Sequence, residues 1–406
     1  MGASEVSDGS ETGDAPTAAA ARDAAFLARD CVDCLPAGGL ERKLALGRPL
    51  RVKLGLDPTA PDVHLGHTVV LRKLREFQDR GHTVVLIIGD YTARVGDPSG
   101  RSSTRPQLSG EQIDINAQTY VDQAAKVLDP DRIELRHNSE WLDMTMEELF
   151  ALTRTTTIAQ LLERDDFSKR YAAREPISIL ELLYPLMQAY DSVAVRADVE
   201  LGGTDQKFNL LLGRDVQRAY GIDEQVALTM PILAGLDGER KMSKSLGNQI
   251  GVSEAPEEIY GKTLSLPDSA MEGWFELLLG EPAPAGLSPR DAKHALARRL
   301  VERCHSPQAA AAAAAHFDRV FVQHALPDEI EEASFDGSAD VVHLPALIAD
   351  SFGRSRADAR RLLGQGAVKL DGQALSGEDL DIAPERLDGA VLQVGKRGFR
   401  RLRRAP

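Results

Sequence analysis

Two histidines separated by two residues, His64 and His67, are a first pair of residues whose type and spacing could do chemistry. They fall where a loop that follows an apolar strand enters a predicted helix, with Gly66 between them. A helix N-terminus presents free N–H groups and a positive dipole end, so imidazoles there can add donors toward the phosphate oxygens of a nucleotide, and a glycine leaves room for it. This spacing also leaves open a pair of surface histidines or half of a metal site.

A second candidate is the loop over 241–245, which reads Lys-Met-Ser-Lys-Ser and is flanked by Gly238 and Gly247. Such a loop can move, and its two lysines can neutralise the charge that develops on a departing pyrophosphate. By itself, a loop of lysines and serines is more typical of a solvated surface.

A third candidate is one face of a predicted helix. Tyr184, Gln188 and Asp191 are spaced i, i+4, i+7 and therefore share that face. Asp191 can accept a hydrogen bond from a phenol, while Tyr184 and Gln188 can orient an amino group with Asp97 as its countercharge. The alternative is a half-exposed amphipathic helix.

The elements that must position these residues alternate between strands and helices. An apolar strand over 52–56, a helix over 66–80 and a buried-type strand over 83–88 form a βαβ unit, and the alternation continues to Ile232. This order predicts the α/β class, with a doubly wound, Rossmann-like parallel sheet whose ligands gather at the carboxyl ends of its strands.

Composition divides the chain into segments. The first is rich in Ala, Ser, Gly and acidic residues, strand signals fade after residue 250, and Ser-Pro pairs then predict helix starts. Near the C-terminus, Ser355 can cap a helix and Asp371-Gly372 can turn a hairpin between strands over 368–375. We expect a disordered acidic tail over 1–24, a Rossmann-like catalytic domain over 25–250 and a helical domain over 251–330. A linker over 331–341 and a small α+β module over 342–406 are expected to follow.

Charge is unevenly distributed. The 406 residues carry a formal net charge of −14, yet residues 341–406 hold 12 Lys and Arg against 8 Asp and Glu. A basic C-terminal segment suits a polyanionic partner, because phosphate contacts come from Lys and Arg. A solvated tail that aids solubility is the alternative.

The chain lacks signals for membranes, secretion and metal. It has no run of about 18 apolar residues, and its acidic N-terminus fits neither a secretory signal nor a transit peptide. Three cysteines favour a reducing compartment, so we expect a cytoplasmic protein without a membrane partner. Cys31 and Cys34 have no second pair to complete a zinc site, and we expect no bound structural metal.

Considered together, the histidines and the lysine loop identify a family. The segments His-Leu-Gly-His over 64–67 and Lys-Met-Ser-Lys-Ser over 241–245 resemble, in order, the HIGH and KMSKS signatures of class I aminoacyl-tRNA synthetases. The segments 55–59, 96–100, 184–191 and 202–206 narrow the resemblance to the bacterial tyrosyl-tRNA synthetases, and it runs from about residue 27 to the C-terminus.

The resemblance implies a tyrosine–tRNA ligase that converts L-tyrosine and ATP, with Mg²⁺ on the phosphates, to tyrosyl-adenylate and pyrophosphate, and then transfers tyrosyl to the 3′-terminal ribose of tRNA(Tyr). It also implies a homodimer, an anticodon-side helical domain and a C-terminal RNA-binding domain similar to one found in a ribosomal protein.

Site roles follow from the same resemblance. Catalysis is assigned to His64, His67, Lys241, Lys244, Arg101 and Arg105. ATP binding is assigned to His64, Gly66, His67, Gly203, Asp205, Lys241, Met242, Ser243, Lys244 and Ser245. Tyrosine binding is assigned to Gly55, Asp57, Thr92, Asp97, Tyr184, Gln188, Asp191 and Gln206. RNA binding is assigned to Arg354, Arg356, Arg360, Arg361, Lys369, Lys396, Arg397 and Arg400.

The chain departs from the family pattern at three places. Lys53 stands where many members carry a tyrosine that helps to bind the substrate hydroxyl, Lys207-Phe208 stands where Trp-Gly is common, and the lysine loop is a full KMSKS. These departures indicate a distinct tyrosyl branch. The alternatives are a tryptophanyl-tRNA synthetase, against which the Asp-Gln of 205–206 and the C-terminal module argue, and a noncatalytic RNA-binding protein, against which the intact histidines and lysines argue.

Overall fold

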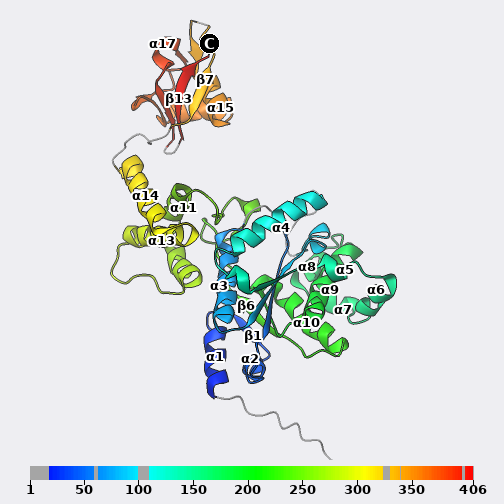
Figure 1. The fold of residues 1–406 in the computed structure, drawn as a ribbon. Coiled ribbons are helices and arrows are strands. Elements are labelled where there is room, and N and C mark those ends of the chain that lie inside the picture. Colours follow the sequence, from blue (N-terminus) through cyan, green and yellow to red (C-terminus); the bar gives the residue numbers. More distant parts are fainter. Residues whose placement is uncertain are drawn as a thin grey trace, which may run out of the picture. The chain divides into compact units, whose positions relative to one another are not determined.

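The computed structural model describes residues 18–58, 63–98, 109–322, 330–338, 340–395 and 398–405. Their contacts divide the chain into two units, residues 1–310 and 311–406 (Figure 1). No helix in the described ranges is long and apolar enough to cross a membrane.

A sheet of six strands, counted over the described residues, organises the first unit in the order β1-β6-β5-β2-β3-β4. Five neighbouring strands are parallel, as the sequence predicted, and β1 pairs with β6 in the antiparallel direction at one edge. The sheet is therefore mostly parallel. The strands are β1 (Asp33–Leu35), β2 (Arg51–Leu56), β3 (Thr83–Ile88), β4 (Ile133–His137), β5 (Val199–Gly203) and β6 (Val226–Met230).

Helices cover both faces of this sheet, which is why β3 is apolar along nearly its whole length. Figure 1 shows α3 (Leu65–Asp79) on one side and α9 (Ile179–Ala194) with α10 (Lys207–Ala219) on the other. Ser178 caps α9 by accepting a hydrogen bond from the Glu181 amide at 3.1 Å. Further helices before residue 250 are α1 (Ala18–Ala28), α2 (Gly39–Leu44), α4 (Gly110–Ala124), α5 (Ser139–Leu142), α6 (Met146–Thr153), α7 (Ile158–Leu161) and α8 (Asp165–Ala172).

Helices continue after residue 250, as predicted. They are α11 (Pro256–Leu264), α12 (Met271–Trp274), α13 (Pro289–Cys304) and α14 (Pro307–Phe317). The contacts separate the two units at Ala310, inside the segment 251–330 that we expected to be one helical domain. The first part of this segment packs on the first unit, where the Trp274 indole donates to the Ala234 carbonyl at 3.0 Å, in the chain that follows β6.

The second unit contains a mixed sheet with the order β10-β9-β12-β13-β7 among the residues described there. Ser355 caps α16 by accepting from the Asp358 amide at 3.1 Å, and β9 and β10 form the predicted hairpin. The elements are β7 (Glu332–Phe335), β8 (Val342–His343), α15 (Leu344–Phe352), α16 (Arg356–Gly364), β9 (Val368–Leu370), β10 (Gln373–Leu375), β11 (Asp381–Ile382), α17 (Pro384–Leu387), β12 (Val391–Val394) and β13 (Gly398–Arg404).

Strand β7 corrects the prediction of a linker over 331–341. It runs parallel to β13 and buries Phe335 in the core of the second unit. The Glu332 carboxylate on β7 forms an ion pair at 2.9 Å with Arg403 on the neighbouring strand β13. The acidic residues at the start of this segment are therefore partners of basic residues on the neighbouring strand.

The N-terminal helix α1 (Ala18–Ala28) corrects the prediction of a disordered tail over 1–24 in part. Its alanines favour a helix, and Ala20, Ala24 and Leu27 are buried within the first unit. The rest of that prediction concerns residues 1–17, which lie outside the described residues.

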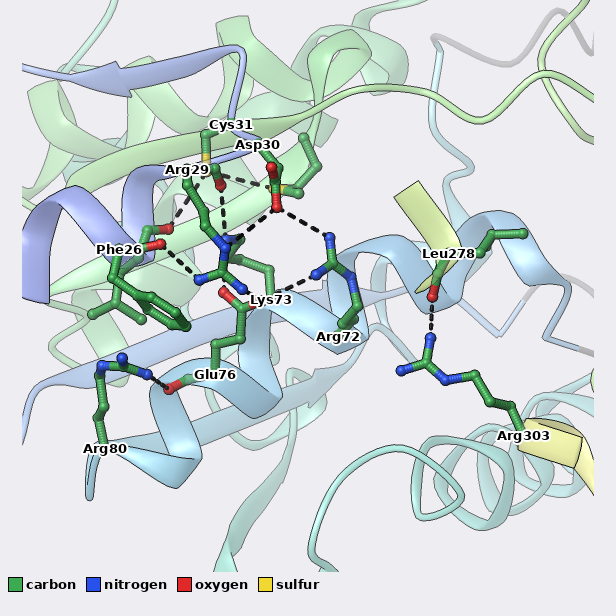
Figure 2. Close-up of polar contacts among 12 residues, drawn as sticks. Phe26, Arg29, Asp30, Cys31, Arg72, Lys73, Glu76, Arg80, Leu278 and Arg303 are labelled. Atoms are coloured by element: carbon green, nitrogen blue, oxygen red, sulfur yellow. Dashed lines mark hydrogen bonds and ion pairs between the residues drawn. The ribbon is translucent and has the colours of Figure 1, made fainter. Parts of the chain in front are cut away.

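An ion-pair network fastens the segment after α1 to helix α3 (Figure 2). The Glu76 carboxylate accepts from Arg29 at 2.7 Å, from Arg72 at 3.1 Å and from Lys73 at 2.7 Å. Lys73 is fully buried and also donates to the Arg29 carbonyl at 2.8 Å. A buried ammonium group depends on such partners, since desolvation is costly without them.

We expect Glu76→Gln to lower the free energy of unfolding by about 2–4 kcal/mol, because the buried Lys73 loses its carboxylate partner. Asp79→Asn breaks the exposed Arg75–Asp79 pair on the same helix and is expected to cost at most about 0.5 kcal/mol. Urea unfolding followed by tryptophan fluorescence measures both, since the only tryptophans, Trp141 and Trp274, lie in the first unit. Equal losses in the two variants would contradict this account.

Candidate active site

A cavity of about 360 Å³ lies at the carboxyl ends of β2, β5 and β6, beside the N-terminus of α3. It brings together most of the residues that the sequence singled out. These are Gly55, Asp57, His64, Gly66, His67, Thr92, Asp97, Tyr184, Gln188, Asp191, Gly203, Asp205, Gln206, Lys241, Met242, Ser243 and Lys244. Ser245 follows in the short 3₁₀ turn Lys244–Leu246, while Arg101 and Arg105 lie outside the described residues.

The two histidines stand at the start of α3 and stack with their ring centroids 3.9 Å apart. The His64 amide donates to Nδ1 of His67 at 3.2 Å. Burial, the other imidazole and the Lys241 charge lower the pKa of His64 to about 2, and burial with Lys241 lowers that of His67 to about 4. Both rings are therefore neutral near pH 7 and act as hydrogen-bonding groups instead of cations.

One atom of this pair is left for a ligand. Nδ1 of His64 is buried, and no hydrogen-bond partner for it exists in the part of the chain that the structure describes. A buried polar atom without a partner is costly, so it marks a point where a bound molecule is expected to contribute one.

The lysine loop meets the histidines across the cavity mouth. Lys241 donates to the Asp205 carboxylate at 2.7 Å, and Met242 packs near Gly66. Asn248, a residue that sequence analysis missed, holds the base of the loop by accepting from the Ser243 amide at 2.8 Å and donating to the Lys241 carbonyl at 3.2 Å. These bonds tie the first half of the loop to the chain that follows it.

Asp191 lies at the buried end of the cavity. It accepts a hydrogen bond from the Trp141 indole at 2.8 Å, and burial raises its pKa to about 7 against the opposing influence of Lys53. Trp141 and Asn138, which also hydrogen-bonds Asp191, were not predicted. A carboxylate so placed can accept a hydrogen bond from a phenol that enters the cavity.

Asp57 and its neighbours form the second acidic group. Its carboxylate accepts from the Thr92 hydroxyl and from the Tyr184 hydroxyl, each at 2.8 Å. Burial raises the pKa of Asp57 to about 6. Gly89 is required here, because a Cβ on it would stand 1.9 Å from an Asp57 carboxylate oxygen.

Asp97 is the third acidic residue of the cavity, and we call Asp57, Asp97 and Asp191 its acidic floor. Asp97 is held by residues from distant segments of the chain. Arg164, which is nearly fully buried, donates to it at 2.9 Å, and Gln206 donates at 2.8 Å. Asn209 joins the Gln188 and Gln206 side chains at 2.8 and 2.9 Å. Sequence analysis missed Arg164 and Asn209, since neither belongs to a motif.

The candidate RNA-binding residues lie in the second unit. Arg354, Arg356, Arg360 and Arg361 are exposed on or beside α16. Lys369 is half-buried on β9, and Arg400 on β13 pairs with Glu331 at 2.7 Å. Lys396 and Arg397 lie outside the described residues.

Comparison with known proteins identifies the family. The model of class I tRNA synthetases (W and Y) matches residues 45–322. The chain is 52% identical to a tyrosine–tRNA ligase of Moorella thermoacetica, over 94% of this chain and 96% of that protein, and 49% identical to one of Bordetella avium over the same shares. The chain belongs to the class I tyrosyl-tRNA synthetases. These relatives decide between the tyrosyl and tryptophanyl branches that share the family model.

Solved structures agree on the fold. A C-terminally truncated mitochondrial tyrosyl-tRNA synthetase of Aspergillus nidulans superposes with a TM-score of 0.61 at 24% identity, covering 74% of this chain and 94% of that one. The tyrosyl-tRNA synthetase of Archaeoglobus fulgidus, solved with L-tyrosine, gives 0.58 at 22% identity, covering 73% and 99%.

The pKa of Asp191 predicts a pH dependence of tyrosine use. Because that pKa is raised to about 7, the carboxylate is mostly ionised at pH 8 and mostly protonated at pH 6.5, so the KM for tyrosine is expected to rise about fourfold on acidification. Pyrophosphate exchange at the two pH values measures it. The KM for ATP serves as the control, because His64 and His67, which are assigned to ATP binding, stay neutral over this range. An unchanged KM for tyrosine would contradict the assignment of Asp191 to the phenol.

Adding one methyl group at either of two cavity glycines is expected to weaken the use of tyrosine but to affect stability differently. Gly89→Ala is expected to lower the melting temperature and to lower kcat/KM for tyrosine by more than tenfold, because the new Cβ would clash with Asp57. Gly55→Ala is expected to leave stability unchanged yet weaken tyrosine binding, since its Cβ meets no atom within 4 Å and stands beside the cavity.

The control for both is Gly273→Ala, whose Cβ also meets nothing within 4 Å and which does not line the cavity. Thermal melting and exchange kinetics separate the three variants. A Gly55→Ala enzyme with unchanged tyrosine KM would place the amino acid elsewhere.

Proposed function

We propose that this cavity is where the chain, as a tyrosine–tRNA ligase, activates L-tyrosine with ATP before transferring tyrosyl to tRNA(Tyr). The observation that carries the proposal is the convergence of three groups on one cavity. The neutral histidines and the lysine loop stand at its mouth, and Asp191 stands at its buried end. Groups suited to bind phosphate and an acceptor for a phenol thus lie at opposite ends of one cavity.

The acidic floor suits tyrosine. Asp191 accepts the phenol hydrogen, and the α-ammonium group lies among Asp57, Asp97, Tyr184 and the amides of Gln188 and Gln206, with Thr92 holding Asp57 in place. An amino acid bound this way directs its carboxylate toward the mouth. No enzyme nucleophile is required, because the tyrosine carboxylate itself attacks the α-phosphate and the reaction needs positioning above all.

The mouth suits MgATP. His64, His67 and the backbone at Gly66 contact the phosphates, Gly203 and Asp205 lie on the ribose and adenine side, and the lysine loop 241–245 neutralises the departing pyrophosphate. Mg²⁺ enters on the phosphates, as is usual for this small cation. Arg101 and Arg105 are assigned to pyrophosphate by family resemblance alone.

Transfer to tRNA draws on the remaining parts of the chain. We assign the helices after residue 250 to the anticodon side and the exposed arginines of α16 to the RNA backbone, which prefers guanidinium partners. The proposed location is the cytoplasm, as the sequence predicted.

The proposed oligomer is a homodimer. Large apolar side chains are exposed on four successive helices of the first unit, α6 to α9, among them Ile179 at 78%, Ile158 at 67% and Met146 at 61%. A monomeric protein rarely exposes so many large apolar side chains in one region. The family resemblance implies that a second copy of the chain covers them.

Pyrophosphate exchange into ATP tests the proposal without tRNA. We expect exchange with tyrosine and none with tryptophan or phenylalanine, and a loss of at least about a hundredfold in Lys244→Ala, because a cation that meets the leaving pyrophosphate is removed. Arg218→Ala, at the distant end of α10, is the matched loss of an exposed cation and is expected to be silent. Exchange with tryptophan, or none with any amino acid from folded protein, would overturn the proposal.

A further inference from the structure

A fully buried lysine lies behind the tyrosine end of the cavity. Lys53 sits on the central strand β2, directly beside Glu200 on β5 in the parallel register, and the exposed fractions of the two side chains are 0% and 1%. Their charged atoms are 2.9 Å apart. A cross-strand ion pair without solvent is rare in a sheet otherwise built of apolar residues, and it requires a reason.

The lysine binds the helix that carries the tyrosine-binding residues. Its Nζ donates to the Gln188 carbonyl at 2.9 Å and to the Ser192 hydroxyl at 2.8 Å, in addition to Glu200. Three acceptors thus match the three hydrogens of the ammonium group. Lys53 does not line the cavity, so it does not replace the direct hydroxyl contact of the tyrosine that many relatives carry at this position.

Both ends of this anchor are further constrained. The Ser192 hydroxyl donates to Glu200 at 3.0 Å, and the buried Gln225 amide donates to the same carboxylate. The anchor holds the turn 188–192 of α9, which carries Gln188 and Asp191. Pro185 removes one backbone hydrogen bond from α9. The hydrogen bonds from Lys53 therefore contribute more to holding this helix in place.

The charge of Lys53 also acts on Asp191. After burial itself, Lys53 is the largest influence on the pKa of Asp191 and lowers it, whereas Glu200 raises it by less. The groups that face Asp191 are therefore the Lys53 cation, the Glu200 anion and the Trp141 and Asn138 donors.

We propose that Lys53 is a positioning residue for tyrosine selection: with Glu200 it fixes the α9 turn that presents Gln188 and Asp191, and it keeps Asp191 an acceptor for the phenol. The inference rests on the proposed function of the cavity. It assigns to an indirect, buried pair the selectivity that a direct contact supplies in relatives with tyrosine at this position.

The test compares two lysine–glutamate pairs in which the lysine is fully buried. The double variant Lys53→Met with Glu200→Gln removes both charges and so avoids an orphaned ion. Lys73→Met with Glu76→Gln removes the same two charges on α3, away from the tyrosine end, and also leaves Arg29 and Arg72 without their Glu76 partner. Pyrophosphate exchange gives the KM and kcat for tyrosine and the ratio of kcat/KM between tyrosine and phenylalanine. Thermal melting reports folding.

For the Lys53 pair we expect the KM for tyrosine to rise about tenfold and the tyrosine-to-phenylalanine ratio to fall about tenfold, with kcat and the KM for ATP within about twofold of the parent. The inflection of the tyrosine KM is expected to move to higher pH, because the larger of two opposing charges on Asp191 is gone. The Lys73 pair is expected to lose stability without any change in the ratio.

Two milder variants decide the matter if the double variant does not fold. Ser192→Ala removes one attachment to α9 and is expected to raise the tyrosine KM about threefold, and Lys53→Arg keeps the charge and is expected to retain the parent's pH inflection. A folded Lys53 or Ser192 variant with unchanged tyrosine KM and ratio would overturn the inference. Wild-type protein that exchanges with no amino acid would instead overturn the proposed function.

Discussion

The active-site region has to hold four carboxylates close together, two of them buried and two partly exposed, without filling the cavity. Asp57, Asp97, Asp191 and Glu200 all lie within the first unit near the carboxyl ends of the parallel strands, and a buried charge is tolerated only with partners. Each carboxylate has hydrogen-bonding or charged partners: the hydroxyls of Thr92 and Tyr184 for Asp57, Arg164 and Gln206 for Asp97, Trp141 and Asn138 for Asp191, and Lys53, Ser192 and Gln225 for Glu200. Thr92, Asn138, Tyr184 and Gln206 line the cavity themselves, whereas the remaining partners stand behind its wall.

This arrangement separates charge along the cavity. The floor is acidic and hydrogen-bonded, whereas the mouth carries neutral imidazoles and the two lysines of the loop. In the proposed function, the floor takes the phenol and the ammonium group of tyrosine and the mouth takes the polyphosphate. The polarity of the site would then orient the tyrosine carboxylate toward the α-phosphate.

The lysine loop shows how a functional motif depends on residues outside it. The HIGH-like and KMSKS segments are recognisable by their letters, yet their relative placement depends on contacts between them. The Leu65 amide donates to the Ile250 carbonyl at 2.9 Å, and the Val252 amide donates to the Val63 carbonyl at 3.0 Å. These bonds tie the entry of α3 to the chain that follows the lysine loop, so the two signatures share one support.

Sequence alone determined the features that are local. The helix periodicity put Tyr184, Gln188 and Asp191 on one face, the alternation of strands and helices predicted the doubly wound sheet, and the two signatures identified the family. Only the tertiary structure decided the partners that are far apart in the chain: Trp141 with Asp191 at a separation of 50 residues, Arg164 with Asp97 at 67, and Lys53 with Gln188 at 135. Spacing within one helix is set by its 3.6-residue repeat, but which distant side chain reaches a buried carboxylate depends on how the elements pack, and no local pattern records that choice.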